Sequence, residues 1–196
     1  MIKKVIVFAN ILCLSVIISN AQELSVGVRA GLNFSNQTLT NLPQPYPSVR
    51  TGFLLGGYAK WMATQKIGIQ SELFYSSLGA IYNPSITEAY NYLSLPIVFR
   101  YNPNDNFHLL LGPQINALLT AKETVSGATL DIKYQSKTID LGGVAGIGFN
   151  IGAFDIGARY YLGLSNKIKP QNQTNGESIK NTSFQIVVGY SLWKNK

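Results

Sequence analysis

The sequence is poor in charge and in cysteine, and after its first 21 residues it lacks long apolar runs. Only 13% of its 196 residues are charged, whereas a soluble domain carries roughly a quarter. This shortage argues against disorder, coiled coils and ordinary soluble helical domains. A membrane-spanning helix needs about 20 consecutive apolar residues, and no stretch after the first 21 residues approaches that. The length suits a single domain.

The first 21 residues have the pattern of a secretory signal peptide, and we expect them to be cleaved. Lys3 and Lys4 form the basic start, residues 5–18 the apolar stretch, and Ser19 and Ala21 the small residues before the cleavage point. The one cysteine, Cys13, lies inside this segment. Residues 22–196 are then expected to form one domain with no disulfide and no cysteine-bound metal.

From residue 24 onward, large apolar residues alternate with small or polar ones at a period of two, which indicates β-strands. Leu24, Val26 and Val28, for example, alternate with Ser25 and Gly27. Most segments reach the roughly 9 to 11 residues that a tilted membrane-spanning strand needs, whereas strands of soluble domains have about 5 or 6. The eight expected strands are residues 24–35, 53–61, 67–75, 92–101, 107–119, 139–150, 154–165 and 183–192.

The charged residues inside these segments all share the phase of the small polar residues. They are Arg29, Lys60, Glu72, Arg100, Asp140, Asp155 and Arg159. A lipocalin-like soluble barrel buries its apolar phase and shows the other to water, so its outer face should be dense in Lys and Glu. A membrane barrel faces lipid with its apolar phase and lines its interior with polar groups. The charge-free apolar phase favours the membrane barrel.

The expected fold is all-β: an eight-stranded antiparallel up-and-down transmembrane β-barrel, closed because lipid offers no partner to an open strand edge. Short connectors at 63–66, 102–106 and 150–153 predict periplasmic turns, and longer ones at 36–50, 81–91, 120–137 and 166–181 predict external loops. We expect the third loop to extend two strands beyond the membrane as a hairpin. Aromatic residues near strand ends resemble interfacial girdles: Phe34 and Tyr75 toward one rim, and Trp61, Tyr101, Phe107, Phe149 and Phe154 near the other.

Four short motifs resemble the small outer-membrane β-barrel family of Bacteroidetes, whose members are described as porin-family or PorT-like. The motifs are QSELFYS at 70–76, YLSLPI at 92–97, LGP at 111–113 and GARYY at 157–161. The resemblance covers essentially all of the chain after the signal peptide. It implies an OmpA/OmpX-type eight-stranded barrel in the bacterial outer membrane. It implies little about activity, because most members have none assigned, although PorT itself is tied to type IX protein secretion.

The candidate site consists of the inward-facing charges and the one histidine. If each hairpin is symmetric about the middle of its connector, Glu72 opposes Arg100 and Arg100 opposes His108, which gives an interior row. Asp140 and Arg159 are expected to be diagonal neighbours. The row suits a proton relay, a ligand site, or ion pairs that fill and rigidify the barrel. We favour the ion pairs, because buried charges must be paired in any case. The full predicted set is Arg29, Lys60, Glu72, Arg100, His108, Asp140 and Arg159.

The sequence shows no catalytic, cofactor or metal site. Eight-stranded outer-membrane barrels include lipid A acyl-modifying enzymes, whose histidine acts near the outer leaflet, but we expect His108 at the periplasmic rim, pointing inward. Nucleophilic catalysis needs the base within hydrogen-bond reach of the nucleophile. No Gly-x-Ser-x-Gly motif, phosphate loop or cluster of metal ligands occurs. The basic residues are too dispersed for nucleic-acid binding.

We therefore expect a monomeric, non-enzymatic, multi-pass barrel of the outer membrane with a structural or surface-interaction role. Lysines in the third and fourth loops suit contact with lipopolysaccharide phosphates, so the expected partners are outer-membrane lipids, lipopolysaccharide and a surface or secretion-system protein. Two alternatives stay open: a narrow porin-like channel for small solutes, and an accessory component of a protein-secretion machine. Inward-facing Arg29, Lys60 and Arg100 would obstruct a channel, because eight strands leave a lumen that side chains just fill.

Overall fold

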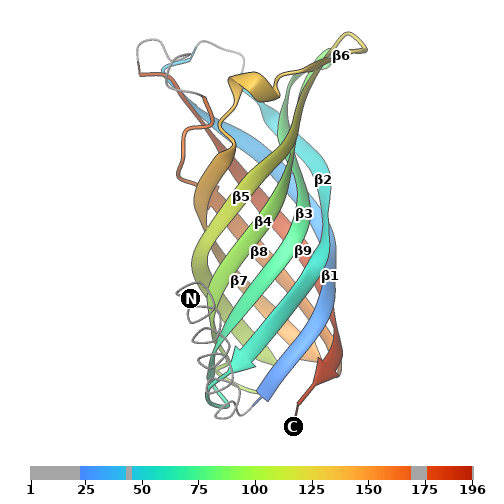
Figure 1. Ribbon diagram of the computed structural model, residues 1–196, viewed down its shortest axis with the longest axis vertical. Coiled ribbons are helices and arrows are strands. Elements are labelled where there is room, and N and C mark those ends of the chain that lie inside the picture. Colours follow the sequence, from blue (N-terminus) through green and yellow to red (C-terminus); the bar gives the residue numbers. More distant parts are fainter. Residues whose placement is uncertain (1–22, 43–45, 169–175, 196) are drawn as a thin grey trace, which may run out of the picture.

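The computed structural model describes residues 23–42, 46–168 and 176–195 and shows a closed barrel (Figure 1). Eight antiparallel strands form the wall in the order β1-β2-β3-β4-β5-β7-β8-β9, and β9 pairs with β1 to close the ring. The expected fold class is confirmed. The predicted signal peptide, with Cys13, lies outside the described residues. The strands are β1 (Glu23–Thr40), β2 (Ser48–Met62), β3 (Ile67–Asn83), β4 (Ile86–Tyr101), β5 (Phe107–Val125), β6 (Ala128–Asp131), β7 (Ile139–Ile151), β8 (Phe154–Gly163) and β9 (Ser178–Lys194).

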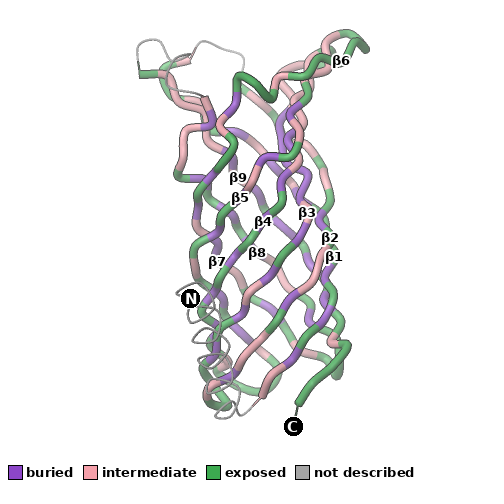
Figure 2. The backbone as a smooth tube through the Cα atoms, viewed as in Figure 1, coloured by how far each residue is buried: buried purple, intermediate pink, exposed green. Residues whose placement is uncertain are grey.

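The wall strands turn polar side chains inward and apolar side chains outward. Figure 2 shows the resulting alternation of buried and exposed positions along each strand. On the outer face, Leu111 and Phe53 are 67% and 52% exposed, whereas Asn33 and Asn116 inside the barrel are fully buried. A continuous apolar exterior of this kind is unfavourable in water and favourable in hydrocarbon. The exterior therefore suits a lipid environment.

The two ends of the barrel differ. At one end, which we call the turn end, β1 begins, β9 ends, and short connections at 63–66, 102–106 and 152–153 join the strands. The first two are as predicted, and the third is shorter than the expected 150–153 because β7 continues to Ile151. At the opposite end, the loop end, most strands run past the length that lipid requires. The wall strands have between 10 and 19 residues, against about 9 to 11 for a crossing. Within the described residues, no helix is long and apolar enough to cross a membrane.

The prediction of a long second external loop at 81–91 is wrong. β3 continues to Asn83 and β4 begins at Ile86, so Pro84 and Ser85 alone form the connection. Beyond the lipid both faces of a strand can carry polar residues, and the hydropathy contrast that marks a strand is lost there. The same effect shortens the first expected loop, 36–50, since β1 reaches Thr40 and β2 begins at Ser48.

The third external loop contains the expected hairpin. β5 runs on to Val125, turns at Ser126 and Gly127, and pairs with β6. Both turn residues have positive φ angles, 48° and 88°, which is the geometry of the tight turn that best matches strand twist. The chain then forms the 3-10 helix η1 (Lys133–Gln135) before entering β7. This hairpin projects beyond the rim of the barrel at the loop end (Figure 1).

Close contact between β4 and β5 depends on a glycine. A Cβ atom at Gly112 would lie 2.2 Å from the carbonyl oxygen of Ile97 and 2.7 Å from the Cα of Val98. Because both atoms belong to the backbone, neither could move aside without shifting β4. At Gly143 on β7, in contrast, the nearest atom to an added Cβ would be 3.9 Å away.

We predict that Gly112→Ala destabilises the barrel by about 1–3 kcal/mol, the usual cost of forcing extra volume into a packed site. The matched variant Gly143→Ala should unfold like the wild-type protein. Urea unfolding in lipid vesicles, followed by heat-modifiable migration on detergent gels, measures both. Equal stabilities for the two variants would contradict the account of strand packing.

Candidate functional site

Five charged side chains meet inside the barrel toward the turn end. Arg29 comes from β1, Glu72 from β3, Arg100 from β4, and Asp155 and Arg159 from β8. Each is at most 7% exposed. We call them the arginine–carboxylate cluster. The strand alternation explains why they point inward, and the closed ring brings them together across the lumen.

Glu72 accepts hydrogen bonds from two arginines on opposite sides. The Arg159 guanidinium binds the carboxylate with both Nη atoms, at 2.8 and 2.7 Å. Arg29 donates to the same carboxylate from β1, and Gln70 adds a further donor. A bidentate arginine–carboxylate pair is among the stronger hydrogen-bonded contacts in proteins. In the ring β3 and β8 lie opposite each other, so the pair of Glu72 with Arg159 crosses the lumen.

Asp155 joins the other two arginines. Its Oδ1 accepts from Arg29 Nη2 at 2.8 Å and its Oδ2 from Arg100 Nη1 at 2.9 Å. Arg100 also donates to Asn150 and to Gln70, both at 2.8 Å. Three guanidinium groups and two carboxylates therefore form one connected network. Buried charges are tolerated only when paired and hydrogen-bonded in this way.

His108 on β5 lies at the edge of this cluster. Its Nε2 is 3.7 Å from Asp155 Oδ2, and its Nδ1 is buried with no hydrogen-bond partner among the described residues. No serine or threonine of the described chain hydrogen-bonds to the ring. A histidine without a nucleophile in reach lacks the geometry of a nucleophilic active site.

The predicted row of Glu72, Arg100 and His108 is wrong in its pairing. The register places Ser71 opposite Ile97, and it places Arg100 opposite Leu110. The prediction assumed that β3 and β4 pair symmetrically about position 86, the middle of the expected loop 81–91. Most of that loop is strand, so the pairing is instead centred at the turn of residues 84–85. Glu72 and Arg100 therefore do not face each other and are linked through Gln70.

The predicted Asp140–Arg159 neighbours are also separated. Arg159 lies opposite Gly146 of β7, whereas Asp140 lies opposite Asn116, six residues from Gly146 along β7 and closer to the loop end. Asp140 instead accepts a hydrogen bond from Asn181 at 3.1 Å. The pairing of β7 with β8 is symmetric about the turn at 152–153, which places Asp140 and Arg159 too far apart along the strands to be diagonal neighbours.

Five members of the predicted set lie in or beside the arginine–carboxylate cluster: Arg29, Glu72, Arg100, His108 and Arg159. The other two, Lys60 and Asp140, lie elsewhere in the barrel. Lys60 lies nearer the turn end, where its Nζ is 2.8 Å from Glu23, and Asp140 lies in the upper interior. The strand alternation predicts that Asp155 faces inward, but Asp155 is not a member of the predicted set. Its distance from the other charges along the chain hid its role, although its phase was a usable signal.

Aromatic side chains pair across neighbouring strands near both rims of the lipid-facing surface. At the turn end Phe107 contacts Phe149, with ring centroids 5.2 Å apart, and Phe154 contacts Tyr190 at 5.1 Å. Trp61 and Tyr101 lie in the last turn-end positions of β2 and β4. Toward the loop end, Phe34 faces Phe184 at 6.4 Å and Tyr75 faces Phe53 at 5.4 Å.

A further ion pair, separate from the arginine–carboxylate cluster, lies inside the barrel at the loop end. Lys167, in the connection between β8 and β9, places its Nζ 2.7 Å from Glu88 and 3.8 Å from the centre of the Tyr90 ring. Glu88 also accepts from the Tyr90 hydroxyl at 2.9 Å and from Gln37 at 3.2 Å. The sequence predicts only that Lys167 is a basic residue of the fourth loop. No local pattern shows that Lys167 folds back into the barrel mouth.

The backbone of the third and fourth loops supports this arrangement. The amide of Lys137 donates to the carbonyl of Lys167 at 2.8 Å, and Ser136 forms a β-bridge with Ile168. Burial lowers the pKa of the Lys167 ammonium to about 8, although the neighbouring Glu88 opposes that shift. Among the described residues, no group of three or more His, Cys, Asp or Glu side chains could hold a metal ion.

We predict that Lys167 titrates near pH 8, below the ordinary lysine value of 10.5. Because the folded chain then holds this proton less tightly than the unfolded chain, the free energy of unfolding should rise between about pH 8 and 10.5. Glu88→Gln removes the attraction that retains the proton and should lower the midpoint further. NMR of the Lys167 ε-carbon measures both effects, with Asp131→Asn as a control at an exposed carboxylate. An ordinary lysine midpoint, or one unmoved by Glu88→Gln, would contradict this prediction.

Comparisons with known proteins agree with the geometry. The chain resembles the attachment invasion locus protein Ail of Yersinia pestis, with a TM-score of 0.52 and 19% identity over 87% of this chain and 98% of Ail. It also resembles Neisserial surface protein A, with a TM-score of 0.58 and 15% identity over 86% of this chain and 99% of the other. Identities this low show a shared fold. The comparison with curated proteins returned no match.

The family comparison extends over most of the chain. The profile described as "Outer membrane protein beta-barrel domain" matches residues 20–169. The match includes β1 to β8 and therefore both carboxylates of the arginine–carboxylate cluster. Together with the lipid-facing exterior, it implies a protein that crosses the bacterial outer membrane with its strands. The chain belongs to the outer membrane protein beta-barrel domain family.

Proposed function

We propose that this protein is a closed, non-conducting outer-membrane barrel that acts through contacts made by its loop end. The observation that carries the proposal is the arginine–carboxylate cluster, whose ion pairs join opposite walls of the lumen. A solute passing through would have to break several buried, charge-assisted hydrogen bonds at once. The short turns then face the periplasm and the loop end faces outward.

A second blockage favours the closed barrel over the narrow channel. Between the cluster and the loop end, the interior is filled by Tyr90, Tyr92 and Tyr161, which are buried together with Leu78 and Leu118. Above them lies the pair of Lys167 with Glu88. Side chains that fill an eight-stranded lumen leave no continuous water path.

The loop end has the features of a contact surface. Tyr46, Tyr134 and Leu130 are 74%, 70% and 56% exposed there, beyond the lipid-facing wall. Tyrosine is enriched where proteins bind partners, because it combines apolar area with a hydroxyl. Lys122 on β5 and Lys133 in η1 lie at the same end of the barrel and are also exposed. These residues support contact with the phosphates of lipopolysaccharide and with a surface protein.

A catalytic role is not part of this proposal, because His108 has no hydroxyl partner and faces away from the outer leaflet.

The PorT-like resemblance implies an alternative, an accessory role in protein secretion, in which secretion components bind at either end of the barrel. Pulldown from detergent-solubilised membranes, with the third-loop hairpin intact or deleted, tests it. Co-purification of secretion components to the same extent with the intact and the hairpin-deleted protein would favour that alternative.

We predict that the purified wild-type protein gives no steady conductance steps in planar lipid bilayers. The triple variant Arg29→Ser, Glu72→Ser, Arg159→Ser removes three long side chains and their charges together, and it should stay closed as well, because Tyr90, Tyr92 and Tyr161 still fill the lumen above the cluster. Heat-modifiable migration identifies the folded fraction of each sample. Reproducible nanosiemens-scale channels from the folded wild-type protein would overturn the closed-barrel proposal.

For the outer surface, we predict that Lys122→Glu with Lys133→Glu weakens binding to lipopolysaccharide. The loss should be largest at low ionic strength and shrink as salt screens the charges. Surface plasmon resonance on nanodisc-embedded protein measures the binding. The control is Lys66→Glu, an exposed lysine at the turn end. If Lys66→Glu weakens binding as much as the loop variant does, the loop end is not the contact surface.

A further inference from the structure

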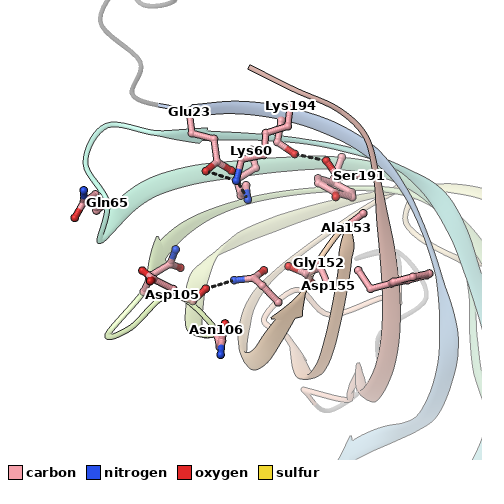
Figure 3. A pocket seen from close by; sticks show the side chains of 15 residues that line it. Glu23, Lys60, Gln65, Asp105, Asn106, Gly152, Ala153, Asp155, Ser191 and Lys194 are labelled. Carbon is pink, nitrogen blue, oxygen red and sulfur yellow. Dashed lines mark hydrogen bonds and ion pairs between the residues drawn. The ribbon is translucent and has the colours of Figure 1, made fainter. Parts of the chain in front are cut away.

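A polar cavity of about 450 Å³ opens at the turn end of the barrel (Figure 3). Ligand pockets commonly have volumes of about 300–1,000 Å³, so the cavity is large enough for a small molecule. Its floor is Asp155 of the arginine–carboxylate cluster, and its rim comes from the first residues of β1, the last of β9 and the three short turns. The proposed function at the loop end makes no use of this cavity.

One wall of the cavity carries an excess of positive charge. Lys60 on β2 and Lys194 on β9 both contact the carboxylate of Glu23, at 2.8 and 2.7 Å. A single carboxylate balances only one of the two ammonium groups, which leaves one positive charge on this wall. The side chain of Lys194 is 49% exposed, so its ammonium can reach a molecule in the cavity. Figure 3 shows the three side chains gathered on one side.

The opposite wall carries an excess of negative charge. Figure 3 places Asp105 and Asn106 across the cavity from Glu23, Lys60 and Lys194. Asp105 is exposed, and among the described residues no cation lies within ion-pair distance of its carboxylate. Asp155 deeper in the cavity is already bound by two arginines. The free negative charge is therefore that of Asp105.

The surface between the two charged walls is lined by amide and hydroxyl groups. Gln65, Asn102, Asn106 and Asn150 contribute amides, and Ser191 contributes a hydroxyl. Amide side chains offer donors and acceptors at the same point, which matches the alternating N–H and C=O groups of a peptide. Asn150 already bonds to Arg100 and to the Asp105 carbonyl, and the Asn102 carbonyl accepts from Arg100, so the amides open to a ligand are those of Gln65 and Asn106. An apolar ligand would leave these two without partners, at a cost in free energy.

We propose that the turn-end cavity binds a short zwitterionic peptide. Its carboxylate lies against Lys194 and Lys60, its ammonium against Asp105, and its peptide group against the amides between them. The separation of charge selects the class of ligand: an anion alone meets the lysines but gains nothing from Asp105, and a cation alone gains nothing from the lysines. A neutral sugar satisfies the amides and uses neither charged wall.

The test uses the folded protein in nanodiscs and the dipeptide L-alanyl-L-alanine as probe, with binding followed by isothermal titration and amide NMR shifts. N-acetyl-alanyl-alanine lacks the ammonium, and alanyl-alanine amide lacks the carboxylate. Each should bind about fivefold more weakly than the dipeptide, as expected for one partly exposed ion pair. Shifts should be confined to residues at the turn end.

Two variants assign each charge to its wall. Asp105→Asn should weaken the dipeptide about fivefold and leave the acetylated analogue unchanged. Lys194→Gln should weaken the dipeptide to a similar extent and leave the amide analogue unchanged. Both residues are exposed enough that neither change should unfold the barrel, which heat-modifiable migration checks. Asp131→Asn at the loop end is the control.

Three results with the peptide ligands would overturn the proposal. They are the absence of dipeptide binding to folded protein, equal binding of the dipeptide and both analogues, and variants that affect all three ligands alike. Sucrose binding as tight as the dipeptide would show that the amides, rather than the charged walls, select the ligand, and this too would overturn it.

Discussion

Lipid offers no hydrogen-bond partners, and the architecture of this protein follows from that constraint. Backbone groups in hydrocarbon must pair within the protein, so the strands close into a ring through the pairing of β9 with β1. The same constraint acts on side chains. Charges on the outer face would be costly, and those on the inner face are stable only when paired. The arginine–carboxylate cluster satisfies this requirement with two carboxylates shared among three guanidinium groups.

The cluster also gives the two ends of the barrel different characters. Below it lies a polar cavity whose charged walls are open at the turn end. Above it, tyrosines and the pair of Lys167 with Glu88 fill the interior, and the third-loop hairpin projects outward (Figure 1). In the proposed function, a partner at the loop end meets exposed side chains of the hairpin, and a solute at the turn end meets a cavity with no passage to the loop end.

Much of the fold could be predicted from the sequence, because the positions of Arg29, Glu72 and Arg159 in the apolar–polar alternation show which face of their strands avoids lipid. The register of β3 with β4 could not, since residues near Glu88 continue the strands into water, where apolar alternation fades. Contacts across the lumen were hidden for another reason. The meeting of Glu72 with Arg159 depends on the tilt and closure of the whole ring, and no local pattern in β3 or β8 encodes it.

The most direct test of the central claim is a double-mutant cycle between Glu72 and Arg159, measured as unfolding free energies in lipid vesicles. Glu72→Gln and Arg159→Gln should each destabilise the barrel, because each leaves a buried charge without its partner. If the pair joins the walls, the double variant should lose less than the sum, with a coupling energy of about 1.5 kcal/mol or more. A coupling energy near zero would contradict an ion pair across the lumen.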